Sequence, residues 1–267
     1  MRMRLNKPIL VFNVKNIRLQ TISTKVNKNV TAILTHVKNA FKKITKPKNP
    51  VFVAAEKLAF KMNNLTSAVI KPLEKSIYLK PYTMHFTQNG VSRTWDLIRV
   101  HDSVAIIIYN ISRDKLVFVR QFRPAVYYGS IPQDDCKDVI NVEKYPAELG
   151  FTIELCAGIV DKDKPLEEIA AEEVFEECGY HVTAESLEKI SSYRSGVGTS
   201  ASLQTAYYCE VTDDMRVSSG GGVDDEIIEV VEMSIDEMKK YITGDNIKSP
   251  PSFMFAMYWF LNRKREN

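Results

Sequence analysis

The sequence predicts an α+β fold, in which a mixed sheet is packed between helices and preceded by an antiparallel hairpin. From Ser76 onward, short apolar runs of strand length alternate with turn residues. A helical pattern follows Pro165, and two more helical patterns end the chain. Because these helices do not alternate regularly with the strands, the pattern differs from that of a parallel α/β sheet and favours an α+β sandwich.

The hairpin is predicted within residues 76–100. Residues 81–86 have the character of a strand, and residues 91–100 form its return. Gln88-Asn89-Gly90 lies between them, and Asn-Gly between two such runs is a strong hairpin signal. A hairpin this small is marginally stable alone, so it must pack on something else.

The core of the fold is predicted over residues 101–262. Strands are expected at 103–110, 115–121, 153–157, 191–194, 206–211 and 227–233. A polar excursion over residues 128–149 interrupts them, and a glycine-rich loop, Gly220 to Gly222, precedes the last strand. We expect these glycines to let the loop close over a bound substrate.

The helix that follows Pro165 can be placed from its end signals and its apolar side. Proline suits the first turn of a helix, and Gly179 can adopt the left-handed conformation that ends one. At about 100° per residue, one sector of the helix is apolar and should face the core. The residues of that sector are Leu166, Ile169, Ala170 and Val174.

Carboxylates lie where this helix should be buried. Glu173 and Glu177 fall inside the apolar sector and Glu176 lies at its edge, whereas Glu168 and Glu172 point to solvent. Two ionised carboxylates four residues apart repel each other, and burying both costs several kcal/mol unless something compensates. A divalent cation compensates naturally, and Mg²⁺ is commonly shared between carboxylates and substrate phosphates. The alternative is an acidic, solvated helix face.

Composition sets further bounds. With 267 residues, 45% of them hydrophobic and 26% charged, the chain can build a sizeable core. It has no apolar run of 18 residues, so no transmembrane span is expected, and its basic residues do not alternate with aromatics as nucleic-acid-binding segments do. The four cysteines lack metal-site spacing and are interpreted as reduced intracellular thiols, which favours the cytoplasm.

Charge is distributed unevenly along the chain. Residues 1–70 contain 14 Lys and Arg and a single acid, which leaves 22 of the 36 basic and 32 of the 33 acidic residues for the remainder. We therefore predict a basic extension over residues 1–75 and a separate domain over residues 76–267. Acid-poor segments with scattered Arg are typical of mitochondrial targeting, and a disordered tail or a membrane-surface tether is the alternative.

The helix also carries a recognisable motif. The order Gly158, Glu173, Glu176, Glu177 and Gly179 resembles the Nudix box, G-x5-E-x7-R-E-U-x-E-E-x-G-U, in which U is a bulky apolar residue. The spacing between the two glycines matches, and the chain is accordingly similar to the Nudix hydrolases. The resemblance implies a Nudix-type α/β/α sandwich and a divalent metal site.

Two positions depart from the box. Lys164 stands where the first Glu is usual, and Glu172 stands where the Arg is usual. In the family that Arg often orients the carboxylates that bind the metal. Because a guanidinium at position 172 could bridge carboxylates that now repel, we expect Glu172→Arg to preserve or raise activity.

The resemblance extends over residues 76–262. The blocks WDLIRVHDSVAIIIYN, LVFVRQFRPAVYYG, ELCAGIVD, EECGYHV, SGVGTSASLQTAYYCEVTDD and IIEVV resemble, in order, the UDP-sugar pyrophosphatases of the family. This implies Mg²⁺-dependent hydrolysis of UDP-glucose to UMP and glucose 1-phosphate. ADP-ribose hydrolysis is the alternative, although the segment Ser195 to Gly198 follows the UDP-sugar branch. A degenerate module that binds nucleotide without turnover is a third possibility, motivated by Lys164 and Glu172.

The resemblance also implies roles for single residues. The metal ligands would be Glu173, Glu176, Glu177, Glu226 and the carbonyl group of Ala157. Asp224 would be the general base, with Glu226 and Glu176 supporting catalysis. Substrate contacts would come from Arg123 and Arg120 to phosphate, Glu154 to ribose or phosphate, and Trp95 to the nucleobase. Relatives often supply that aromatic residue from the partner subunit, which implies a homodimer.

Overall fold

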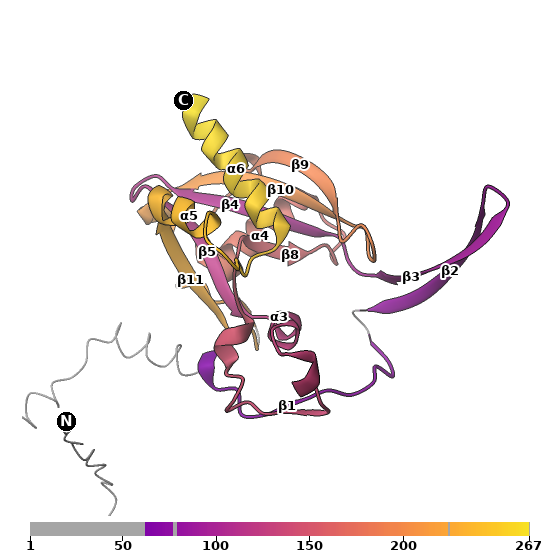
Figure 1. Cartoon of the computed structure of the whole chain (residues 1–267). Coiled ribbons are helices and arrows are strands. Elements are labelled where there is room, and N and C mark those ends of the chain that lie inside the picture. Colours follow the sequence, from indigo (N-terminus) through magenta and orange to yellow (C-terminus); the bar gives the residue numbers. More distant parts are fainter. Residues whose placement is uncertain (1–61, 77–78, 224, 267) are drawn as a thin grey trace, which may run out of the picture. The chain divides into compact units, whose positions relative to one another are not determined.

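A computed structural model of the chain describes residues 62–76, 79–223 and 225–266. All of them belong to one compact unit, Ala54–Asn267. The predicted basic extension, residues 1–75, falls mostly outside the described residues, and the boundary at residue 76 stays a prediction. Figure 1 shows how the elements of the described part are arranged.

A mixed seven-stranded sheet forms the centre of this unit. Its main path runs β11 (Ile228–Ser234), β5 (Lys115–Phe122), β4 (Ser103–Asn110), β10 (Ser202–Val211) and β9 (Glu188–Ser195). Strand β7 (Phe151–Glu154) pairs with β5, and β8 (Cys156–Ile159) pairs with β4. Only β4 and β10 run parallel among these pairs, which confirms the predicted mixed sheet.

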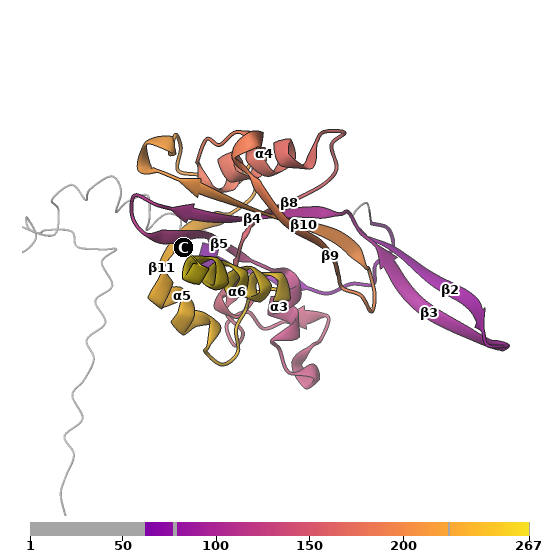
Figure 2. The same cartoon turned by 90° about the horizontal axis from the view of Figure 1, so that it is seen from above.

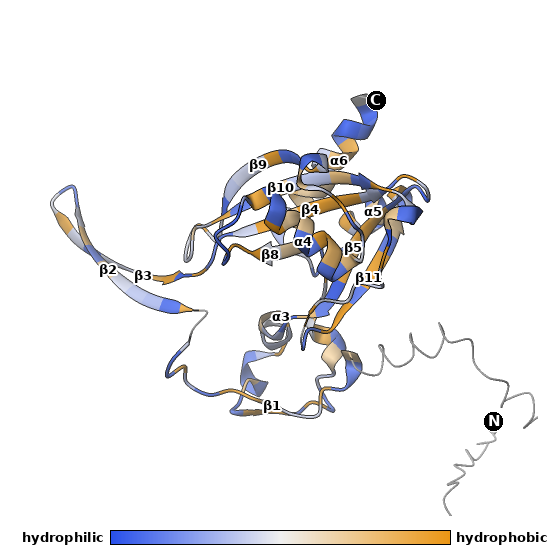
Figure 3. Cartoon of the chain, turned by 180° about the vertical axis from the view of Figure 1, so that it is seen from behind, coloured by the Kyte–Doolittle hydropathy of each residue, from blue (hydrophilic) through white to orange (hydrophobic). Residues whose placement is uncertain are grey.

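Helices cover both faces of the sheet, as the predicted sandwich requires. Figure 2 shows α4 (Leu166–Cys178) on one side, and α5 (Ile235–Ile242) and α6 (Pro251–Glu266) on the other. Strand β4 is buried on both faces, so its residues alternate between two cores: Ile106 lies in the core under α4, and Ile107 lies in the core under α6. In Figure 3 the strands β4 and β5 carry mostly hydrophobic colours, whereas the end of α6 is hydrophilic.

The predicted polar excursion is more ordered than its sequence suggests. It contains α3 (Pro124–Gly129), β6 (Val139–Ile140) and the 3-10 turns η1 (Gln133–Asp135) and η2 (Ala147–Gly150). Strand β1 (Ala68–Val69) pairs with β6, and together these elements enclose a third, smaller core. Each element is too short to show a period. Two further 3-10 turns, η3 (Ala184–Ser186) and η4 (Asp213–Met215), follow α4 and β10.

The predicted hairpin is present as β2 (Lys80–Gln88) and β3 (Val91–Arg99). Asn89 and Gly90 both have positive φ, +54° and +75°, which two-residue hairpin turns of the I′ type require. The hairpin is largely exposed on both faces, including its aromatic residues Tyr82 and Trp95. Among the described residues, no helix is long and apolar enough to cross a membrane.

Candidate active site

Helix α4 begins and ends close to the predicted positions. Pro165 precedes the first helical residue, and Gly179 ends the helix in the left-handed conformation with φ +79°. Ile169, Ala170 and Val174 are buried in the core under the helix, as the predicted apolar sector requires. The same sector brings two carboxylates towards the sheet.

Glu177 is the most buried of these carboxylates. Its side chain is 5% exposed, and its Oε2 accepts a hydrogen bond from the backbone N–H of Ala157 at 3.0 Å. Burial raises the pKa of Glu177 to about 8, and the hydrogen bond offsets this only in part. The ionised form is therefore the costly one in the absence of a cation.

Glu173 lies one turn earlier, against Gly158 of strand β8. A Cβ atom at Gly158 would overlap the carboxylate of Glu173, so only glycine allows this approach. Burial, and next the charge of Glu176, raise the pKa of Glu173 to about 7. Within the described part of the chain, neither Glu173 nor Glu177 forms an ion pair.

This donor set fits a hard divalent cation. Carboxylate oxygens that are buried and not neutralised by a basic side chain are the ligands that Mg²⁺ prefers. Among the described residues, no group of three or more Asp, Glu, His or Cys side chains is positioned to hold a metal ion, so Glu173 and Glu177 would need further ligands from water or substrate phosphate. The last turn of a helix also favours a positive charge.

The position of Ala157 is consistent with its expected role. Its N–H points to Glu177 and away from the neighbouring strand β4. In an antiparallel strand the N–H and C=O of one residue point to the same edge, so the carbonyl of Ala157 faces the side of Glu177 as well. The chain thus directs a neutral oxygen towards the two buried carboxylates.

The loop before β11 brings a further carboxylate to this side. Glu226 is exposed, and its Oε2 accepts the N–H of Val223 at 3.0 Å. Its charge acts on Glu173 and Glu177, whose pKa values it helps to raise. Asp224, the expected general base, lies outside the described residues.

Arg123 and Glu154 form a bidentate pair beside the carboxylates. The Nε and Nη2 atoms of Arg123 each donate to Glu154 at 2.8 Å, and Thr152 donates to the same carboxylate at 2.6 Å. Although burial raises the pKa of Glu154, the bonds from Arg123 and Thr152 lower it below its usual value. Glu154 was expected to contact substrate. Its oxygens accept three hydrogen bonds in this structure, two of them from Arg123, and its contact with substrate stays a prediction.

The structure places Arg120 away from the glutamates of α4 and leaves Trp95 exposed on the hairpin. Arg120 pairs with Glu229 at 3.1 Å and lies over the ring of Phe151. Along β5 it alternates with Val119, which packs under α4, so Arg120 is on the opposite face of the sheet from the glutamates. Trp95 is 56% exposed, and its Nε1 donates to the carbonyl oxygen of Gly198 at 2.9 Å. The described chain therefore does not bring Arg120 to Glu173 and Glu177.

The two departures from the expected motif contact each other. Glu172 accepts hydrogen bonds from Lys164 and, at 2.8 Å, from Lys162. The acid and the base that are usual at positions 164 and 172 are thus exchanged, and the attraction between them is kept. Glu172 was expected to point to solvent. The helical period could not predict its pairing, because Lys162 and Lys164 lie in the turn before the helix.

Comparison with known proteins assigns the family. No family model matches the sequence. Over 216 residues the chain is 37% identical to the uridine diphosphate glucose pyrophosphatase NUDT14 of Mus musculus, and the match covers 76% of this chain and 96% of that protein. The chain belongs to the Nudix hydrolases.

Other Nudix relatives agree with this assignment. The uridine diphosphate glucose pyrophosphatase NUDT14 of Bos taurus is 38% identical over 213 residues, covering 75% of this chain and 96% of that protein. A GDP-mannose pyrophosphatase of Cronobacter sakazakii is 34% identical over 157 residues, covering 59% and 72%. A crystal structure of an ADP compounds hydrolase covers 76% of this chain and 93% of its own with a TM-score of 0.52. At 15% identity it supports the fold alone.

The buried carboxylates of the Nudix helix predict a linkage between protons and metal. Both pKa values are raised, so the metal-free stability that these groups contribute is fully present below about pH 4.5 and is lost as the pH rises through 7 to 8. Metal must displace these protons. We expect calorimetry at pH 7 in two buffers of different ionisation enthalpy to show release of about one proton per Mg²⁺ bound. Glu177→Gln should reduce that release, and binding without any proton release would contradict the linkage.

The exchanged pair predicts a charge-reversal rescue. Glu172→Arg places a third cation beside Lys162 and Lys164 and removes the ion pairs of Glu172, whereas its effect on activity stays a prediction. We expect this variant to lower the Tm by about 2–4 °C, and the double variant Lys164→Glu/Glu172→Arg to recover most of the loss. The matched control is Glu168→Arg on the exposed side of the same helix, which should change little. Equal Tm values for the single and double variants would show that the contact has no importance.

Proposed function

We propose that the chain hydrolyses the pyrophosphate bond of UDP-sugars in a Mg²⁺-dependent reaction, releasing UMP and glucose 1-phosphate from UDP-glucose. The observation that carries this proposal is the match over 96% of the UDP-glucose pyrophosphatase of Mus musculus. The buried Glu177 and the half-buried Glu173 of α4 support it. Water attacks one phosphorus atom and the P–O bond to the bridging oxygen breaks, so that each product keeps one phosphate.

The residues take the following roles in this proposal. Glu173, Glu177, Glu176 and the carbonyl of Ala157 hold Mg²⁺ from the helix and strand side, and Glu226 holds it from the loop. In that place a divalent cation would supply charge neutralisation at the phosphoryl oxygens and would acidify the attacking water. Asp224 accepts the proton of that water.

Arg123 binds the pyrophosphate. The Nε and Nη2 atoms of Arg123 donate to the carboxylate of Glu154, so the Nη1 atom of Arg123 remains to donate to a phosphate oxygen. The charges of Glu177 and Glu226 also act on this guanidinium, which supports its place beside the metal site. Glu154 keeps Arg123 in one orientation before substrate arrives.

The competing readings are less well supported. ADP-ribose hydrolysis shares the QFRP segment, and a solved ADP compounds hydrolase shares the fold, but no described residue favours adenine over uracil. A module without turnover was motivated by the two box departures. Because Lys164 and Glu172 pair with each other, these departures no longer argue for a damaged site.

We propose further that the chain acts as a homodimer, with the hairpin β2–β3 completing the partner's nucleobase site. Trp95 is held by Gly198 at its indole N–H while 56% of its surface remains exposed, which suits a stacking platform. The cytoplasm is the proposed compartment, supported by four free cysteines. Mitochondrial targeting by the basic N-terminal segment is the alternative.

The function is tested with a panel of nucleoside-diphosphate sugars, each with and without Mg²⁺. We expect UDP-glucose to have the highest kcat/KM, and chelation of the metal to abolish turnover. Glu177→Gln should reduce kcat at least tenfold at saturating Mg²⁺ without changing the fold, because it keeps the volume but removes the charge of one ligand. A preference for ADP-ribose would select the alternative substrate, and no turnover of any member would select the binding module.

The shared site is tested by mixing two inactive chains. In a heterodimer of Trp95→Ala and Glu177→Gln subunits, a site built across the interface regains both intact residues at one of its two positions. Random assortment then gives about a quarter of wild-type activity. The control mixes wild type with the double variant Trp95→Ala/Glu177→Gln. If heterodimers form and no activity returns, Trp95 serves its own subunit.

A further inference from the structure

The glycine-rich loop is attached to the end of the Nudix helix by its backbone. The N–H groups of Gly221 and Gly222 donate to the carbonyl oxygens of Glu177 and Glu176 at 2.9 and 3.1 Å. These carbonyls are in the last turn of α4, where no intrahelical partner is available. The loop therefore completes the backbone hydrogen bonding of Glu176 and Glu177, two residues of the proposed metal site.

The glycines serve close approach in this loop. A Cβ atom at Gly220 would overlap the carbonyl oxygen of Glu177, and its φ of +66° is itself unfavourable for other residues. The sequence suggested that Gly220 to Gly222 make the loop mobile. In the structure they also let it pack against the helix end, and closure of the loop over substrate stays a prediction.

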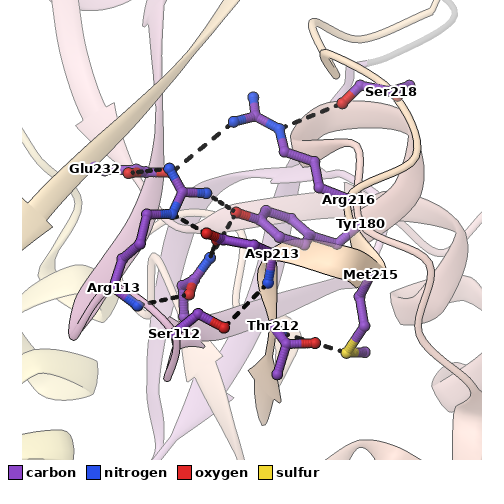
Figure 4. A network of polar contacts seen from close by, with 10 residues as sticks. Ser112, Arg113, Tyr180, Thr212, Asp213, Met215, Arg216, Ser218 and Glu232 are labelled. Atoms are coloured by element: carbon purple, nitrogen blue, oxygen red, sulfur yellow. Dashed lines mark hydrogen bonds and ion pairs between the residues drawn. The ribbon is translucent and has the colours of Figure 1, made fainter.

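Arg216 holds the segment just before these glycines. Its Nε donates to the carbonyl oxygen of Ser218 and its Nη2 to that of Ser219, both at 3.3 Å. Figure 4 shows the guanidinium of Arg216 directed towards Glu232, with Nη1 at 4.0 Å from that carboxylate. The same guanidinium lies 5.7 Å from the ring centroid of Tyr180. A single planar group thus joins the loop to the body of the domain.

The anchor under Arg216 is a polar network that extends from the buried Tyr180 and Asn110 to partly exposed charged side chains. Tyr180 is fully buried, and its hydroxyl accepts hydrogen bonds from Asn110 at 3.1 Å and from Arg113 at 3.0 Å. Arg113 also pairs with Asp213 at 2.7 Å and with Glu232 at 2.8 Å (Figure 4). Four segments meet in this network, so its members cannot shift independently.

We propose that Arg216 is a positioning residue of the metal site: by fixing the carbonyls of Ser218 and Ser219, it sets the loop that carries Glu226 against the carboxylates of α4. Only a planar group with several donors can hold two successive carbonyls and still face Glu232. The inference rests on the proposed metal role of Glu226 and not on the identity of the sugar nucleotide.

The test removes the guanidinium and follows the metal site without substrate. Arg216→Met keeps the aliphatic stem, and Arg216→Lys keeps the charge. Arg263→Met is the matched control. Arg263 lies on helix α6, far from the loop in sequence, and pairs with Glu188 of strand β9. We measure Mn²⁺ affinity by electron paramagnetic resonance, hydrogen exchange of the amides of residues 217–223, and kcat and KM for UDP-glucose.

We expect Arg216→Met to weaken Mn²⁺ binding about tenfold, as removal of groups that orient metal ligands commonly does. Exchange at Gly221 and Gly222 should become at least tenfold faster, kcat should fall and KM should stay within about twofold. Arg216→Lys should recover part of each loss. Should Arg216→Met fail to fold, Arg216→Lys carries the test: because one ammonium group does not reproduce the planar guanidinium, Mn²⁺ binding should still be weaker, and exchange at Gly221 and Gly222 still faster, than in the Arg263→Met control.

Mn²⁺ affinity and amide exchange equal to those of the Arg263→Met control would overturn the proposal. Faster exchange with unchanged Mn²⁺ affinity would also overturn it, because the loop would then be anchored without positioning a ligand. If UDP-glucose is not turned over but Mn²⁺ binding weakens as expected, the positioning role stands and the proposed substrate fails.

Discussion

The structure depends on a conflict between burial and charge at one end of helix α4. Glu173 and Glu177 are turned inward by the same helical sector that packs Ile169 and Val174 into the core. Burial raises both pKa values into the range of 7 to 8, and the described residues supply Glu177 with a backbone N–H but no ion pair. When these two carboxylates are ionised at their inward positions, they lower the free energy of unfolding of the domain unless a cation binds there.

The surrounding elements are arranged around that conflict. Gly158 makes room for Glu173, Ala157 bonds Glu177, and the glycine-rich loop satisfies the carbonyls at the helix end. Arg123 approaches from strand β5, already held in place by Glu154. The contacts of Gly158, Ala157 and the glycine-rich loop each join α4 to another segment, so the metal side of the helix is defined by tertiary structure and not by the motif alone.

The sequence predicted the parts that depend on local period and turn chemistry. The hairpin followed from Asn89-Gly90, the central strands from their apolar runs, and the inward angle of Glu173 and Glu177 from the helical period. It could not give the face of Arg120, since an error of one residue in register moves a side chain across the sheet. Lys164 pairs with Glu172, and Arg216 donates hydrogen bonds to the loop. Both contacts depend on how the chain folds back, and the pattern of a single helix or strand does not predict them.

The central claim is that the inward carboxylates of α4 are retained to hold a divalent cation, and it is tested most directly by locating such an ion. We suggest crystals of the protein soaked in millimolar Mn²⁺ at pH 8, with anomalous scattering recorded at the manganese edge. The account predicts an anomalous peak between the carboxylates of Glu173 and Glu177 and the carbonyl oxygen of Ala157. A peak confined to surface carboxylates, or none at this position, would contradict it.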